Sequence, residues 1–341
     1  MELLEQLCRA DGISGYEGNI AAIMTKELKK SCDDVFTDKF GNVIGKKGKG
    51  AKKIMLAAHM DEVGLLIKHV TKEGYLYFVK VGGIDDRLLV DQRVVIKTKN
   101  GDVVGIIGSK PPHLQRDDER KKVIKYEDMF IDIGASSKKD AEKIVELGDP
   151  VIFEPSFGKL GKDLHYGKAV DNRAGCYILL KVMEKIPSNI NATIYAVGSC
   201  QEEVGLKGAR VAAFRIDPDY ALALDTTLAG DTPGIKETES SLKVGKGPAI
   251  TLLEAAGRGV ITHPKVRDVL MKTAKKKRIP IQIDVLEGGM TDAAIIYLTR
   301  EGIPSGVISV ATRYIHGSAA VFSMVDVNNA IKLTVEAVKN L

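Results

Sequence analysis

The feature that most constrains this chain is an alternation of apolar, strand-like runs with helical segments, which extends from residue 162 to the end of the sequence. Such alternation is typical of an α/β sheet whose strands are connected by helices packed on its faces. Residues 54–58 (IMLAA) add a short continuous apolar run, as expected for a strand buried on both faces. The sheet therefore collects strands from both ends of the chain.

Between these parts, from about residue 69 to 161, the pattern changes to short β-branched runs separated by Gly and Asp turns. Closely spaced short strands predict a small sandwich or barrel. One helix is expected inside this region, over Lys138–Leu147, and the polar stretch 116–125 is expected to be a surface loop. We therefore predict an α/β domain made of residues 1–68 and 162–341, a mixed sheet flanked by helices, interrupted by an inserted β-rich, barrel-like domain at 69–161.

Composition excludes several classes of partner. The 341 residues carry 50 basic and 45 acidic side chains, and a net charge of +5 is too small and too dispersed to indicate nucleic-acid binding. No run of about 18 apolar residues is present to cross a bilayer, and the opening MELLEQ is unlike a signal peptide. The four cysteines form no CxxC pair, which favours reduced thiols. We expect a cytoplasmic protein with no membrane or nucleic-acid partner.

Acidic and histidine residues directly follow several of the apolar runs. In an α/β sheet such residues gather at the carboxyl edge of the strands, where ligands bind. These residues are His59 and Asp61, Asp171, the adjacent pair Glu202 and Glu203, Asp225, and His316.

Each of these residues has a structural explanation when taken alone. His59-x-Asp61 is a weak motif, Asp171 stands where a helix N-cap would be, and the adjacent Glu202 and Glu203 could be solvated on a loop. Together they supply the nitrogen and oxygen ligands that suit zinc, cobalt or manganese.

The same set also meets the needs of a two-metal site, which requires a shared carboxylate, terminal ligands on each ion and a free carboxylate to accept a proton. Asp171 could be the shared ligand and Glu202 the general base. Asp61 could orient His59, because residues two apart on a strand share a face. His59 and Asp225 would then serve one ion, and Glu203 and His316 the other.

Other catalytic motifs are missing from the sequence. It has no GxSxG elbow, HExxH helix, Walker loop or GxGxxG fingerprint, so serine hydrolases, mononuclear zincins, P-loop NTPases and Rossmann dehydrogenases have no motif support.

At these segments the sequence closely resembles the tetrahedral aminopeptidases, the family that includes glutamyl, leucyl and lysyl aminopeptidases and members once labelled endoglucanases. The resemblance covers essentially the whole chain, through AAHMDEVGLLIKH, GGIDDRLLVDQRVVI, GKAVDNRAGC, QEEVGLKGA, ALDTTLAGDTPG, GGMTDAA and RYIHGSAAV. It departs from the family pattern at Asn172, where many relatives have Asp, and at Gly317-Ser318, where Ser-Pro is usual.

The resemblance implies a dinuclear metallopeptidase with two divalent ions, zinc or cobalt, that removes N-terminal residues from peptides. It gives the metal ligands as His59, Asp171, Glu203, Asp225 and His316, with Glu202 as catalytic base and Asp61 as the carboxylate that orients the first histidine. It also implies that the inserted domain makes dimers, which assemble into a tetrahedral dodecamer.

This function has three alternatives. A glycosidase would use Glu202 and Glu203 as acid and base, but sequence-adjacent carboxylates are poorly placed to flank a bond, and the chain has no Trp. A non-catalytic assembly protein is not favoured because all five expected ligands are present. A deacylase acting on blocked amino acids with the same metals stays open. Substrate-lining side chains are expected from segments 225–260 and 286–292.

Overall fold

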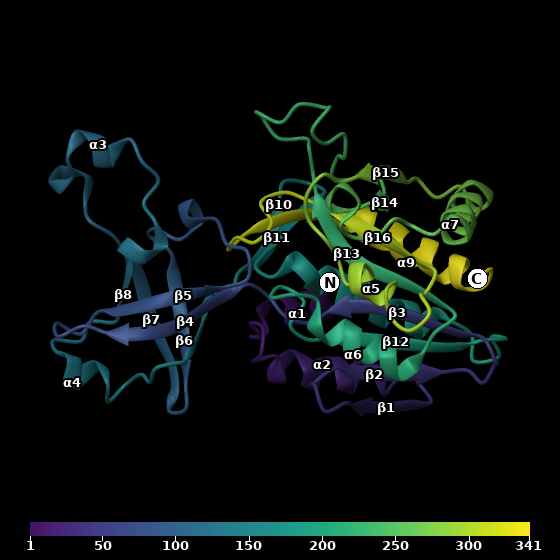
Figure 1. The fold of residues 1–341 in the computed structure, drawn as a ribbon, viewed down its shortest axis with the longest axis horizontal. Coiled ribbons are helices and arrows are strands. Elements are labelled where there is room, and N and C mark those ends of the chain that lie inside the picture. The colour runs from purple at the N-terminus through teal and green to yellow at the C-terminus, as the bar shows by residue number, and fades with distance from the viewer.

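The computed structural model describes residues 1–341, which form a large α/β unit and a smaller β-barrel beside it (Figure 1). The α/β unit is built on one eight-stranded mixed sheet. Its strands run in the order β1 (Asp34–Thr37), β2 (Val43–Lys47), β12 (Thr193–Ser199), β3 (Lys53–His59), β13 (Tyr220–Leu228), β16 (Ser305–Thr312), β14 (Ala249–Leu253) and β15 (Gln282–Val285). The four central strands β12, β3, β13 and β16 are parallel, whereas β2 and β14 pair antiparallel to them.

Helices cover both faces of this sheet. The larger hydrophobic core lies under α1 (Glu2–Arg9), α2 (Gly18–Leu28), α5 (Val170–Lys185), α7 (Pro264–Lys277) and α9 (Met324–Val338). The smaller core lies under α6 (Lys207–Ile216) and α8 (Ala293–Ile296). Strand β3 is buried on both faces: Ile54 and Leu56 pack in the larger core, and Met55 and Ala57 pack in the smaller one. This explains why its sequence is a continuous apolar run.

The smaller unit is a closed antiparallel barrel with its own core of 17 buried residues. The barrel strands run in the order β4 (Gly64–Val70), β5 (Leu76–Val81), β8 (Phe130–Asp132), β7 (Gly101–Gly108), β6 (Arg93–Thr98) and β9 (Pro150–Phe153). The fold class predicted from the sequence is thus confirmed. The expected boundary at residue 69 falls within β4.

A three-stranded sheet of β10 (Phe157–Leu160), β11 (Leu164–Gly167) and β17 (Ala320–Ser323) follows the barrel in the chain. Two short helices lie in the inserted region, α3 (Asp117–Arg120) and α4 (Lys138–Ala141).

The helix predicted over Lys138–Leu147 was wrong in its length, since α4 ends at Ala141. Beyond it the chain turns back to the barrel, where Gly148, in the left-handed region at φ 88°, donates its N–H to the carbonyl of Ile67. This long-range hydrogen bond outweighs the local helical pattern.

The parallel strands end at one edge of the sheet, on the side facing the barrel junction. In the register of the sheet, His59 at the end of β3 lies beside Ser199 at the end of β12, and Asp225 in β13 lies beside Ser309 in β16. The sheet therefore brings the expected functional segments together. None of the helices combines the length and the apolar character needed to span a membrane.

Candidate metal centre

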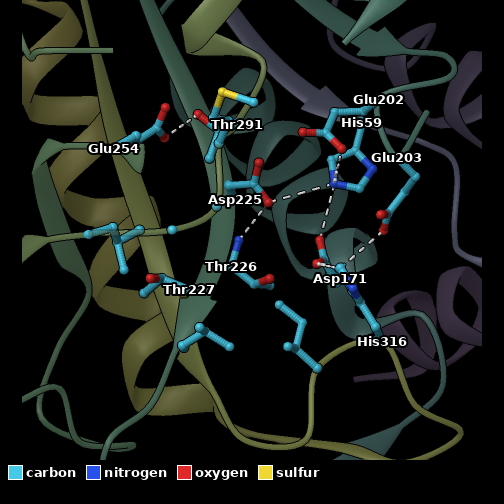
Figure 2. Close-up of a pocket in the computed structure, with 16 residues that line it drawn as sticks. His59, Asp171, Glu202, Glu203, Asp225, Thr226, Thr227, Glu254, Thr291 and His316 are labelled. Atoms are coloured by element: carbon cyan, nitrogen blue, oxygen red, sulfur yellow. Dashed lines mark hydrogen bonds and ion pairs between the residues drawn. The ribbon is translucent and has the colours of Figure 1, made fainter. Parts of the chain in front are cut away.

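Six of the expected residues meet in one cavity at the carboxyl edge of the sheet (Figure 2). They come from five different segments: His59 from the end of β3, Asp171 from the start of α5, Glu202 and Glu203 from the loop after β12, Asp225 from within β13, and His316 from the loop after β16. The seventh residue, Asp61, lies behind His59 and does not line the cavity.

The centre of the cluster is Asp171, whose carboxylate lies between the two histidines. Its Oδ1 is 3.1 Å from Nε2 of His59, and its Oδ2 is 3.1 Å from Nε2 of His316. One carboxylate thus presents a separate oxygen to each ring.

Both histidines are held by their other ring nitrogen. Nδ1 of His59 is 3.1 Å from the carbonyl oxygen of Asp61, and Nδ1 of His316 is 2.7 Å from the carbonyl oxygen of Gly83. A carbonyl only accepts, so each Nδ1 must donate and each Nε2 is turned toward Asp171. This second hydrogen bond is the one that fixes the tautomer of metal-binding histidines in proteins.

The remaining carboxylates complete two groups around the histidines. Asp225 Oδ1 lies 3.7 Å and Glu202 Oε2 3.9 Å from Nε2 of His59. Glu203 Oε1 lies 3.5 Å from Nε2 of His316 and is buried with no hydrogen-bond partner.

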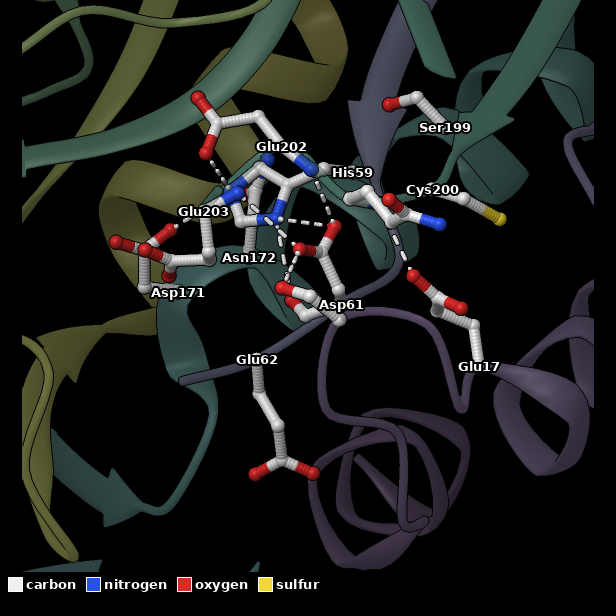
Figure 3. A network of polar contacts seen from close by, with 12 residues as sticks. Glu17, His59, Asp61, Glu62, Asp171, Asn172, Ser199, Cys200, Glu202 and Glu203 are labelled. Atoms are coloured by element: carbon white, nitrogen blue, oxygen red, sulfur yellow. Dashed lines mark hydrogen bonds and ion pairs between the residues drawn. The ribbon is translucent and has the colours of Figure 1, made fainter. Parts of the chain in front are cut away.

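Asp61 holds the loop that carries both glutamates (Figure 3). Its carboxylate accepts the backbone N–H groups of Glu202 at 3.0 Å and Glu203 at 3.1 Å, and the hydroxyl of Ser14 at 2.6 Å. The carboxylate itself is 3.6 Å from Nδ1 of His59, farther than the Asp61 carbonyl. Asp61 therefore links the His59 ring to the glutamate loop.

The pKa values in the cluster show a shortage of positive charge. Burial raises the pKa of Glu203 to about 8, helped by the neighbouring charge of Asp171, and burial also raises the pKa values of Glu202 and Asp225. For His316, burial lowers the pKa, but the hydrogen bond to Asp171 and the charge of Glu203 outweigh it and raise the pKa to about 9. Buried carboxylates outnumber the histidines, so the cluster holds extra protons.

The donor set fits divalent cations. Two groups of side chains have ligand atoms within 4.8 Å of one another: His59 with Glu202 and Asp225, and His59 with Asp171 and Glu203. Neutral imidazole nitrogens and carboxylate oxygens suit zinc and other first-row divalent ions. A cation would replace the extra protons and give the buried Oε1 of Glu203 a partner.

The helix-capping role considered for Asp171 belongs to its neighbour Asn172. The Asn172 Oδ1 accepts the N–H of Gly175 at 2.9 Å, and its Nδ2 donates to the carbonyl of Leu224 at 2.8 Å. The residue that departs from the family pattern thus caps α5 and ties it to β13, which leaves the Asp171 carboxylate free to face both histidines.

The cavity encloses about 290 Å³ and continues beyond the cluster along residues 226–228 and 286–291, with Glu254 and Ile315. Sequence reasoning gave only the approximate segments for this part and did not identify Glu254. Gly83 lies in the GGIDD segment, but no feature of that segment indicates that its carbonyl contacts His316. No local pattern marks Glu254 or Gly83, because their roles depend on partners far away in the chain.

Known structures share this fold over the whole chain. A TET aminopeptidase from a marine-sediment Thaumarchaeota archaeon is 40% identical, with a TM-score of 0.96 over 100% of this chain and 96% of that one. The TET1 peptidase of Pyrococcus horikoshii, described as able to assemble into a tetrahedron or a large octahedral shell, is 35% identical, with a TM-score of 0.88 over 99% and 98%. The fold is that of the TET aminopeptidases.

Sequence comparison agrees with this assignment. The lysyl aminopeptidase of Pyrococcus furiosus is 36% identical over 97% of this chain and 94% of its own length. The M42 glutamyl aminopeptidase family model matches residues 41–333. The chain therefore belongs to the M42 glutamyl aminopeptidase family and is a hydrolase of the aminopeptidase type.

Proposed function

We propose that this protein is a dinuclear metal-dependent aminopeptidase in which Asp171 is shared by two divalent ions. The observation that carries the proposal is the position of Asp171, with one oxygen 3.1 Å from Nε2 of His59 and the other 3.1 Å from Nε2 of His316. Asp225 would complete the ligands on the His59 side and Glu203 those on the His316 side. Zinc or cobalt suits this mixture of nitrogen and oxygen donors.

When bound, such ions lower the pKa of water and polarise the carbonyl of the scissile peptide bond. Proton transfer then requires a side chain of the protein that acts as acid and base. Glu202 is buried and lines the cavity, and its raised pKa suits a group that accepts a proton from water and returns it to the leaving amine. The Asp61 carboxylate, through the backbone N–H of Glu202, would keep this base in position.

The charge of the cavity favours a free N-terminus. Five carboxylates line the cavity, those of Asp171, Glu202, Glu203, Asp225 and Glu254, and no Lys or Arg does. Two divalent ions would offset four of these charges and leave the cavity slightly negative, with no basic side chain to pair with the carboxylate at the end of a peptide. This supports an aminopeptidase over a carboxypeptidase.

A glycosidase using Glu202 and Glu203 is less well supported. Glycosidases need two carboxylates on opposite sides of the bond. Here Glu202 faces His59 and Glu203 faces His316, and the two histidines meet at the same Asp171. Both glutamates thus lie around the same proposed two-ion site, on either side of Asp171.

We also propose that the inserted region 69–161, which contains most of the barrel, is a dimerisation domain. The dimers would then build a tetrahedral dodecamer. Strands β5 and β7, which both pair with β8 in the barrel, expose large apolar side chains: Val104 and Ile106 on β7, Tyr77 on β5, and Tyr75 just before β5. Exposed apolar side chains in such a group are typical of a surface that another subunit covers.

One experiment tests both the requirement for metal and the requirement for a free N-terminus on the substrate. Metal-free full-length protein is reconstituted with zinc or cobalt and assayed on matched peptides with free and acetylated N-termini. We expect cleavage only with metal and only of the free peptide. Activity indifferent to metal, or preference for the acetylated peptide, would contradict the proposal.

The role of Glu202 is tested by Glu202→Gln, which keeps the shape of the side chain. We expect metal content close to wild type and a kcat lower by about 100- to 10,000-fold, the usual contribution of a positioned acid–base group. Retained turnover would remove Glu202 from this role.

A further inference from the structure

The half of the cavity beyond the metal cluster differs in character from the cluster itself. Its exposed walls are apolar: Leu228 at the end of β13 and Met290 are about half exposed, at 51% and 50%, and Leu286 and Ile315 are partly buried. In Figure 2, Glu254 and Thr291 lie beyond Asp225, on the side away from Glu203 and His316. This half is where a side chain next to the reacting carbonyl would be received.

The single ionisable group in this half is Glu254, and its oxygens are already occupied. Oε1 accepts the hydroxyl of Thr291 at 2.7 Å, and Oε2 accepts the N–H of Val260 at 3.2 Å. The residue is fully buried, at 0% exposure, and burial raises the pKa of its carboxyl group to about 7, so at neutral pH it carries only part of a negative charge. Glu254 thus fixes Thr291 to the end of β14 and offers a substrate no free oxygen.

No basic side chain is available to pair with an acidic substrate side chain. None of the 16 residues lining the cavity is Lys or Arg. Arg258, the basic residue nearest to Glu254 in sequence, donates its Nε–H to the carbonyl of Ala255 at 3.1 Å and does not line the cavity. An acidic side chain would lose its water without gaining a partner, and would do so near Glu254.

From this arrangement we infer that the enzyme selects peptides that begin with an uncharged apolar residue, such as Leu or Met, and rejects those that begin with Glu or Asp. The inference rests on the proposed function, and it differs from the glutamyl specificity in the family's description. A lysine would be intermediate. Its stem fits the apolar wall, but its ammonium finds the oxygens of Glu254 already bound to Thr291 and Val260.

The first test compares kcat/KM of the metal-reconstituted full-length enzyme on three peptides that differ only in an N-terminal Leu, Lys or Glu. We expect the order Leu, Lys, Glu, with Leu about 100-fold above Glu, since an unpaired charge in a pocket is strongly rejected. Glu equal to or better than Leu would overturn the inference, as would Lys more than tenfold above Leu. Failure to cleave any of the three would instead contradict the proposed aminopeptidase function.

The second test supplies the missing cation. Met290→Lys places an ammonium on an exposed wall, so folding is little affected, and Met290→Gln is the matched uncharged control. We expect Met290→Lys to raise kcat/KM on the Glu peptide about tenfold and to lower it on the Leu peptide, with no gain on Glu in Met290→Gln. An equal change in both variants, or no gain in Met290→Lys, would overturn the assignment of this wall.

Discussion

The two sides of Asp171 are built in different ways. On one side, the His59 side chain is 2% exposed and Asp225 is 6% exposed, and both residues sit on central strands of the sheet. On the other side, His316 is 29% exposed and lies on a loop, and its ring is held by the carbonyl of Gly83, which follows strand β5 of the barrel. One side therefore belongs to the rigid core, and the other forms only where a loop and the inserted barrel meet.

This difference indicates how the two proposed ions should behave. A ligand on a buried strand is held by its packing, whereas a ligand on a loop depends on its hydrogen-bonded supports. We expect the ion on the His59 side to bind more tightly, and the ion on the His316 side to be lost first.

The largest effect is expected where the two sides meet. Asp171→Asn removes the shared charge from both sides, so we expect less than one ion per chain and a kcat reduced by about 1,000-fold or more, which corresponds to about 4 kcal/mol. Metal analysis of the purified variant and steady-state kinetics are the measurements.

The matched control for this substitution is Asp284→Asn. Asp284 is a buried carboxylate that accepts the hydroxyls of Thr227 and Thr251, outside the cluster. It should keep its full metal content. Similar metal loss in both variants would show that Asp171 acts through the stability of the fold and not as a ligand.

The pH dependence of metal binding should be the next largest effect, and both sides should contribute to it. Burial lowers the pKa of His59, but the charge of Glu202 and the hydrogen bond to Asp171 outweigh it and raise the pKa, as happens at His316. In the metal-free protein the pKa of His316 is raised to about 9 and that of Glu203 to about 8. Since the folded pKa of His316 lies above its ordinary value of about 6.5, the protonated ring stabilises the metal-free fold fully below that value, and this stabilisation is lost as the pH rises through 9. Metal binding must displace these protons, so affinity should weaken as the pH falls from 9.

Calorimetry at pH 7 in buffers of different ionisation enthalpy measures this proton release. We expect roughly two to three protons released per chain at pH 7, from His316, Glu203 and His59, and fewer at pH 9. Binding without proton release at pH 7 would contradict the role of these groups as ligands.

The smallest effect is expected from the support of the His316 loop. Arg313 forms a two-pronged ion pair with Asp231, at 2.8 and 2.6 Å, and its backbone pairs with Val321 to close the loop. Lys cannot make both contacts. Arg313→Lys should therefore weaken only the second metal-binding step, by about tenfold, with kcat at saturating metal nearly unchanged.

Arg300→Lys is the control, because Arg300 donates to the carbonyl of Phe214 away from the site. Two results would contradict the difference between the two sides: a weaker first, tighter metal-binding step in Arg313→Lys, or an equal loss of metal affinity in Arg300→Lys.

The sequence predicted the His59 side of the molecule best. Residues at the ends of parallel strands must meet at one edge of the sheet, so an apolar run followed by His59 or by Glu202 already indicates the site. The sequence could not show that the carbonyl of Gly83 holds the ring of His316. The two residues are more than 200 positions apart, and no local pattern encodes such a contact. The same limit applies to Glu254 and to α4, whose end is decided by a hydrogen bond to β4.

The most direct test of the central claim is a titration of the metal-free full-length protein with zinc or cobalt, with peptide cleavage recorded at each addition. If Asp171 is shared by two ions, binding should occur in two steps that total two ions per chain. Activity should rise with the second step, and His316→Ala should lose that step alone. Full activity with one ion per chain, or activity without metal, would contradict the account.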